Sequence, residues 1–289
     1  MTFIPASHMV TALHALFDAD MITSLYSEPT LVIDTSYGST VGIVGYEPLY
    51  EADSRSHVEL LEPHIARVME QANLTPHEVQ RIIVGTGPAP FTGLRAGIVA
   101  ARAMAFATHA QILGMDVLSI QNAWNRLEQA NMAQFESSSH AKQKIHYTLA
   151  VNDARRKQLY FALYDDMGNE LLAKDIDFAE HIAERVVAIL DHTCMSSDVL
   201  IDIIGHGATK YKDAWTELPT GEIREESVLH DAKAAGLAIT AACAVRAQHE
   251  GKSISDEPLY LRRPDVTIPA PQKHILGQTA ISMPVGGRR

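Results

Sequence analysis

Short apolar runs and longer stretches of helical period alternate along this chain. Residues 30–44 and 81–84 form apolar runs that predict strands, and residues 57–73 between them carry apolar side chains at helical spacing. Residues 94–108 predict an alanine-rich helix, and residues 116–119 predict a following strand. The first part of the chain therefore predicts alternating strands and helices, as in an α/β lobe.

A polar stretch at residues 136–144 separates this first set from a second one. In the second set, strands are predicted at residues 146–151, 158–164 and 199–205. Helices are predicted at residues 178–190 and 230–250. Strands followed by helices in each half predict two similar α/β lobes, at residues 30–135 and 145–263. We expect residues 1–29 to be a loosely held extension and the proline-rich residues 264–289 to be an extended tail.

Composition narrows the class of protein. The chain has 289 residues, of which 46% are hydrophobic, enough for one large or two modest cores. The net charge of −11 disfavours a protein that holds a polyanion by itself, because phosphate neutralisation needs clustered Lys and Arg. Cys194 and Cys243 form no disulfide framework and no metal pattern. No apolar run has the length of a membrane-spanning helix, and no secretory signal is visible, so we expect a cytoplasmic protein.

A glycine- and proline-rich turn joins the strand at 81–84 to the helix at 94–108. It reads Gly85-Thr86-Gly87-Pro88-Ala89-Pro90-Phe91-Thr92-Gly93-Leu94-Arg95. Pro88 and Pro90 fix two φ angles and remove two backbone donors, so the turn is rigid. Pro90 stands where a dinucleotide-binding fingerprint has its third glycine, and no Gly-Lys-Ser/Thr ending marks a phosphate-binding loop.

Four motifs in this chain, in the same order, resemble those of the TsaB (YeaZ) family, which takes part in making threonylcarbamoyladenosine in tRNA. They are Ile33-Asp34-Thr35-Ser36, the turn at 85–95, Asp153-Ala154-Arg155 with Tyr160, and Pro258-Leu259-Tyr260-Leu261-Arg262. Ala89 departs from the family pattern, which usually has glycine there. The resemblance implies the actin-like/Hsp70-like ATPase fold, built from two ribonuclease-H-like lobes with mixed sheets flanked by helices.

The resemblance also implies a partner surface, because that family builds a four-helix bundle with TsaD or with a second copy of itself. The residues expected to line this surface are His57, Leu60, Leu61, His64, Val68, Gly97, Ala100, Ala101 and Met104. The small residues of the 94–108 helix would let another helix approach closely; the alternative is burial between its own sheet and a neighbouring helix. Residues expected to hold the preceding turn are Gly87, Pro88, Phe91, Thr92, Gly93 and Arg95.

Asp34 and Thr35 are candidates for a degenerate nucleotide site. An actin-like ATPase has an Asp at this strand end that approaches the metal-bound nucleotide; the alternative is a turn in which Asp34 accepts hydrogen bonds from the next amides. His57 and His64 are seven residues apart, whereas a helical zinc pair is four apart, so packing or partner contact is favoured over metal binding.

The charged cluster of Asp153, Arg155, Arg156 and Lys157 is open to two interpretations, a contact with an anion or tRNA and a solvated hairpin. The Gly205-His206-Gly207 segment favours a strand-end turn over a phosphate contact.

Two functions remain as hypotheses. The first is a non-catalytic subunit that binds and activates a TsaD-type transferase, with a TsaE-type ATPase in the assembly. This chain would then be a homodimer when alone, reach tRNA only through the complex, and need no cofactor or membrane. The second is a metal-dependent peptidase or small-molecule kinase of the same fold. A kinase needs two phosphate loops and a metal Asp, of which only Asp34 is plausible, and neither a metal triad nor a nucleophile for a peptidase is seen.

Overall fold

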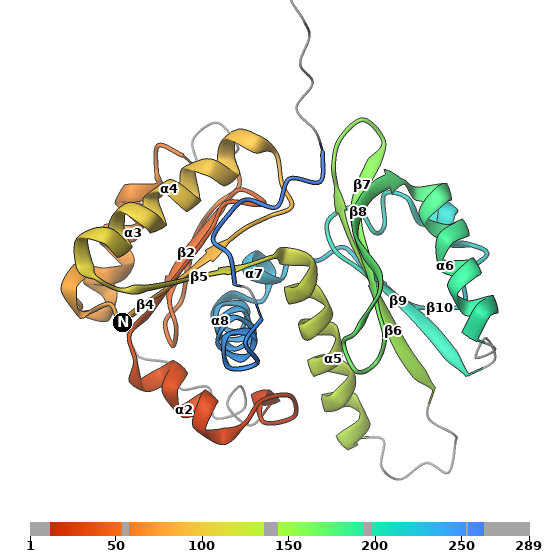
Figure 1. Cartoon of the computed structure of the whole chain (residues 1–289), viewed down its shortest axis with the longest axis horizontal. Coiled ribbons are helices and arrows are strands. Elements are labelled where there is room, and N and C mark those ends of the chain that lie inside the picture. The colour runs from red at the N-terminus through yellow and green to blue at the C-terminus, as the bar shows by residue number, and fades with distance from the viewer. Residues whose placement is uncertain (1–11, 54–57, 136–143, 194–197, 253, 263–289) are drawn as a thin grey trace, which may run out of the picture.

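Each half of the chain folds around a five-stranded sheet, in a computed structural model that describes residues 12–53, 58–135, 144–193, 198–252 and 254–262 (Figure 1). The strands of the first sheet are β1 (Thr30–Asp34), β2 (Ser39–Ile43), β3 (Leu49–Glu51), β4 (Arg81–Gly85) and β5 (Gln111–Met115). They lie in the order β3-β2-β1-β4-β5. The β1–β2 and β2–β3 pairs are antiparallel, whereas β4 pairs in parallel with both β1 and β5.

The second sheet repeats this topology. Its strands are β6 (Ile145–Asp153), β7 (Gln158–Tyr164), β8 (Glu170–Phe178), β9 (Val199–Ile204) and β10 (Thr220–Arg224). They lie in the order β8-β7-β6-β9-β10, with an antiparallel β6–β7–β8 meander and a parallel β6–β9–β10 set. The duplication gives two ribonuclease-H-like lobes, so the expected actin-like ATPase fold is confirmed.

Alternation along β1 explains how both faces of the first sheet are buried. Leu31 and Ile33 face the helices α3 (Leu61–Ala72) and α4 (Phe91–Thr108), and Val32 faces the helices on the other side. Those helices are α2 (Ala19–Ser27) and α8 (Lys233–His249), and Figure 1 shows the sheet between the two pairs.

Two helices cross the boundary that the sequence predicted between the lobes. Helix α5 (Val117–Phe135) follows the first sheet in the chain but packs on β6, β7 and β9 of the second. Helix α8 follows the second sheet but packs on β1, β2, β4 and β5 of the first. The two helices also pack against each other and so join the lobes. The far face of the second sheet is covered by α6 (Ala179–Thr193), and the short α7 (Val228–Asp231) precedes α8.

The N-terminal segment is held firmly from residue 12 onward, so the expectation of a loose extension is wrong for its described part. Leu13, Phe17, Met21 and Leu25 are all buried and share one core with α8. The physical reason is that α8 is apolar nearly all round, so its outward side needs a cover that the sheet cannot provide. The tail from Pro264 lies outside the described residues.

The prediction of a strand at residues 116–119 is also wrong. The strand is Gln111–Met115, and Asp116 stands at the N-cap just before α5. Its carboxylate accepts hydrogen bonds from the Ser119 amide at 2.9 Å and from the Ser119 hydroxyl at 2.8 Å. This is N-capping, in which a side-chain oxygen satisfies an amide of the first helical turn. Short 3-10 turns at Pro76–Glu78 and Lys212–Trp215 complete the described structure.

Candidate functional site

The carboxyl ends of parallel strands from both sheets face one another across a cleft. β1 and β4 end there in the first lobe, and β6 and β9 end there in the second. Ligands of α/β folds bind at such strand ends. The cavity in this cleft measures about 50 Å³, which is room for a few water molecules. Its lining includes Asp34, Ser36, Tyr37, Pro88, Gln121, Asn152, Tyr160 and His206.

Asp34 lies buried at the end of β1 and forms the turn that follows it. The Ser36 hydroxyl donates to Asp34 Oδ1 at 2.7 Å, and the amides of Thr35 and Ser36 also donate to this carboxylate. Burial raises the pKa of Asp34 to about 6, because loss of water outweighs these three hydrogen bonds. Gly85 on the neighbouring β4 allows the close approach, since a Cβ there would lie 1.8 Å from Asp34 Oδ1.

This geometry supports the turn interpretation of Asp34. Thr35 is also buried, and its γ-methyl and hydroxyl lie against α4. A nucleotide site at Asp34 and Thr35 stays a prediction.

One contact between the lobes and two hydrogen bonds within the second lobe order the side chains that line the cleft. The rings of Tyr37 and His206 are 4.0 Å apart, one from the β1–β2 turn and the other from the segment after β9. Gln121 Nε2 donates to Asn152 Oδ1 at 2.8 Å, and the His206 amide donates to the same oxygen at 3.0 Å. Sequence reasoning gave no role to Gln121 or Asn152, because the two side chains meet only when α5 packs on the second sheet.

The Gly205-His206-Gly207 segment is a strand-end turn, which is the interpretation that the sequence favoured. Gly205 and Gly207 have φ values of +126° and +125°, which L residues with side chains avoid. A Cβ on Gly205 would lie 2.2 Å from the Val151 carbonyl oxygen. The backbone carbonyl of His206 accepts from the Asp153 amide, so this turn is bound to the end of β6.

The turn at residues 85–95 ties three segments together. Gly87 has φ +89°, and its carbonyl accepts from the Val117 amide at the start of α5. The Thr86 carbonyl accepts from the Leu259 amide of the C-terminal segment at 2.8 Å. Helix α4 begins at Phe91, so Thr92 and Gly93 belong to its first turn, and Pro88 lines the cleft.

Four residues expected to line the partner surface are core residues instead, so that assignment is wrong for them. Leu61, Val68, Gly97 and Ala101 are buried under the first sheet of their own lobe. The small side chains of α4 serve helix–sheet packing: a Cβ on Gly97 would lie 2.4 Å from Thr35 Oγ1. Half-buried members of the set are Leu60, His64, Ala100 and Met104, and His57 lies outside the described residues.

The opposite side of α4 carries large apolar side chains in the open. Phe106 is 87% exposed and Val99 is 64% exposed. Ala103 is exposed as well, and the spacing of four and then three residues places all three on one helix face. We call Val99, Ala103 and Phe106 the α4 stripe. Sequence periodicity could not find it, because α4 is apolar on every side.

The described residues offer neither a metal cluster nor a membrane-spanning helix. Among them, no group of three or more His, Cys, Asp and Glu side chains lies close enough to hold a metal ion. None of the helices in the described ranges combines the length and apolarity needed to cross a membrane.

Comparison with known proteins gives a family match over most of the chain. Residues 47–269 match the family model described as TsaD: tRNA N6-adenosine threonylcarbamoyltransferase. Uncharacterized proteins from Mycobacterium bovis and Mycobacterium tuberculosis are 34% identical over 143 residues. This alignment covers 47% of the chain and spans 59% of the length of those relatives.

Among solved structures, YeaZ from Pseudomonas aeruginosa superimposes with a TM-score of 0.56 at 21% identity, covering 81% of this chain and 100% of YeaZ. An uncharacterized protein with similarity to the peptidase YEAZ from Pseudomonas aeruginosa gives a TM-score of 0.54 at 21% identity, with the same coverage of both chains. At this level of identity the likeness shows a shared fold.

Proposed function

Since the chain belongs to the TsaD family of tRNA N6-adenosine threonylcarbamoyltransferases, we propose that it serves in making threonylcarbamoyladenosine in tRNA as an accessory subunit. Its role is to bind a TsaD-type transferase and hold it in its active arrangement. The YeaZ-like fold and the four TsaB (YeaZ) motifs support this role over that of the transferase itself.

The α4 stripe is the observation that carries the proposal. Phe106 and Val99 are large, apolar and mostly exposed, and the stripe contains no charged residue. Burying a Phe or Val side chain contributes roughly 1.5–3 kcal/mol, so these two residues alone could anchor a specific contact. Because the stripe lies on the outer surface of a rigid helix, a partner helix could dock on it without changing the lobe.

The cleft supports an accessory role as well. Its cavity is small and is lined by the Tyr37–His206 ring pair, and the Asp34 carboxylate is engaged by its own turn. In this arrangement the strand ends hold the two lobes together. The proposed mechanism is therefore activation by binding energy, with a TsaE-type ATPase joining the assembly and tRNA reaching this subunit through the complex. Alone, the chain pairs with a second copy through the same stripe, in the cytoplasm.

Reconstitution of tRNA modification tests this function. The cognate TsaD-type transferase, with its threonylcarbamoyl donor, is assayed with and without the purified chain. We expect modification to need both proteins, and we expect the chain alone to neither modify tRNA nor turn over ATP. Transfer by the transferase at full rate without this chain would contradict the proposal. Turnover of ATP or peptide by the purified chain would favour a kinase or peptidase of the same fold instead.

A further inference from the structure

The turn between β6 and β7 holds three cationic residues in an unfavourable backbone conformation. Arg155, Arg156 and Lys157 have φ values of +62°, +52° and +62°. Glycine, asparagine or aspartate ordinarily occupies such left-handed positions, because a longer side chain is disfavoured there. Backbone outliers of this kind persist where the surrounding structure enforces them, and they cluster at functional sites. The turn therefore keeps three positive charges at a cost in stability.

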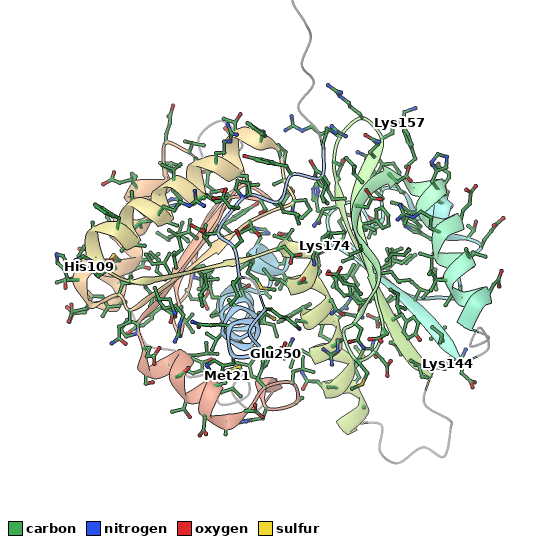
Figure 2. All side chains as sticks on the ribbon, viewed as in Figure 1. Met21, His109, Lys144, Lys157, Lys174 and Glu250 are labelled. Atoms are coloured by element: carbon green, nitrogen blue, oxygen red, sulfur yellow. The ribbon has the colours of Figure 1, made fainter. Side chains whose placement is uncertain are left out.

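This turn forms one wall of a groove of about 450 Å³. Arg155 and Arg156 line it from the turn, and Tyr160 lines it from β7. The opposite wall consists of Phe91 at the start of α4 and the C-terminal segment with Tyr260 and Arg262. Figure 2 shows Lys157 at the tip of the β6–β7 hairpin, and Figure 1 shows the C-terminal segment rising beside it between the lobes.

The aromatic wall is fixed in place. The rings of Phe91 and Tyr260 stack with centroids 4.7 Å apart and planes at 23°. The guanidinium of Arg95 lies 3.6 Å from the Phe91 centroid, and its Nε donates to the Tyr260 hydroxyl at 2.6 Å. Tyr260 nonetheless stays 40% exposed. A partly exposed aromatic ring that is already ordered is a suitable platform for a stacked base, because little further entropy is lost on binding.

The charge of the groove is opposite to that of the chain as a whole. The chain carries −11, whereas Arg155, Arg156 and Arg262 line this one groove, and Lys157 follows in the same turn. Asp153 at the base of the turn is already engaged, by Lys210 at 2.5 Å and by the Arg155 amide at 2.8 Å. Arg262 is oriented by a hydrogen bond of 2.7 Å from its Nη2 to Gln158 Oε1.

We propose that this groove binds a single-stranded segment of RNA, with phosphates on the arginines and a base stacked on Tyr260. Guanidinium groups beside an exposed aromatic ring are the combination that recognises unpaired RNA. An acidic peptide would use the cations and leave the aromatic wall without a role. The inference rests on the proposed function, because it gives the tRNA of the assembly a contact on this subunit.

RNA binding by the full chain at low salt tests the groove. The probe is a fluorescent single-stranded RNA of about a dozen nucleotides, and binding is followed by anisotropy over a series of salt concentrations. For Arg155→Ala with Arg156→Ala we expect roughly tenfold weaker binding. The slope of log K against log salt should shrink by about 0.7 for each lost phosphate contact. Lys212→Ala removes one exposed cation of the second lobe and should change neither quantity. An equal loss with Lys212→Ala would overturn the site.

Arg155→Gly separates a binding role from a purely structural one. Glycine accepts the left-handed backbone at this position, so the variant should raise Tm, by about 2 °C, while RNA binding weakens. A rise in Tm with unchanged RNA affinity would show that the turn does not contact RNA and would overturn the proposal.

Crosslinking locates the contact directly. RNA carrying 4-thiouridine should crosslink to the peptide that contains Tyr260, and Tyr260→Ala should abolish that crosslink. Crosslinks confined to other surfaces, or equal competition by polyglutamate, would overturn the assignment to RNA. Both arginine variants should still bind the transferase with wild-type affinity. If the wild-type chain does not bind the transferase, the proposed function is contradicted. The groove is still tested separately by the Tyr260 crosslink.

Discussion

The two sides of α4 have opposite compositions and opposite roles. The inner side has Gly97 and Ala101 against the first sheet, and the outer side has Val99 and Phe106 in the open. Small residues on the inner side let the helix approach its own strands, so they stabilise the lobe. Large apolar residues on the outer side contribute nothing visible to the lobe and are available to a partner. A stripe of small residues is therefore evidence of close packing, whereas exposed large residues are evidence of an interface.

The inner side should be the most sensitive to a charge. Ala101 is fully buried on the side of α4 that faces the sheet, so Ala101→Glu would place an unpaired carboxylate in the core. We expect a loss of about 4 kcal/mol or more in the free energy of unfolding. Thermal unfolding followed by circular dichroism measures this. A variant that stays as stable as wild type would show that Ala101 faces outward and would reverse the comparison.

The inner side ends at the cleft, where Gly97 meets Thr35 beside the buried Asp34. The pKa of Asp34 is raised to about 6 in the folded chain, above its ordinary value near 4 in the unfolded chain. The folded state thus binds more protons between these values, and the stability contributed by protonated Asp34 is lost as pH rises from about 4 to 6.

Asp34→Asn should remove this pH dependence. At pH 7 we expect it to be more stable than wild type by roughly 2–3 kcal/mol, because two pKa units correspond to about 2.7 kcal/mol. Urea unfolding of both proteins between pH 4 and 8 gives the comparison. Parallel pH profiles for the two proteins would show that Asp34 does not titrate in this range.

A smaller change, at the contact between Gly97 and Thr35, should have a smaller effect on stability. Gly97→Ala would bring a Cβ to 2.4 Å from Thr35 Oγ1, and we expect a loss of roughly 1–3 kcal/mol from this overpacking. Thr35→Ala removes the hydroxyl, so the double variant should recover part of the loss. Additive losses in a double-mutant cycle would mean that the two residues do not share a contact.

The strands and the two-lobe fold were predictable because their signals are local. Apolar runs bounded by turn residues marked β1, β4, β6, β7 and β9, and the family motifs lie at strand ends. The two sides of α4 were not predictable, because a helix that is apolar all round does not indicate which side is covered. Residues 116–119 were wrongly predicted as a strand for a similar reason. Their short apolar pair fits a strand or a helix equally well, and in the structure it begins a helix that Asp116 caps.

Other features depend on contacts between distant parts of the chain. The Arg95–Tyr260 hydrogen bond spans 165 positions, and no local pattern announces it. The burial of α2 follows from the crossing of α8 to the first sheet, which the order of elements alone does not reveal. These long-range contacts also form the aromatic wall of the groove, so the groove emerges only from the folded structure.

The affinity of the cognate TsaD-type transferase for the Phe106→Glu variant tests whether the α4 stripe is the partner surface. Met167→Glu is the matched control, because Met167 is a 70% exposed apolar residue in the β7–β8 turn of the other lobe. Titration calorimetry, with circular dichroism and light scattering on each variant, gives affinity, folding and self-association. We expect Phe106→Glu to stay folded, to lose self-association and to bind the transferase at least tenfold more weakly, a change of about 1.4 kcal/mol, while Met167→Glu behaves as wild type. A folded Phe106→Glu variant with wild-type affinity for the transferase would contradict this assignment of the partner surface.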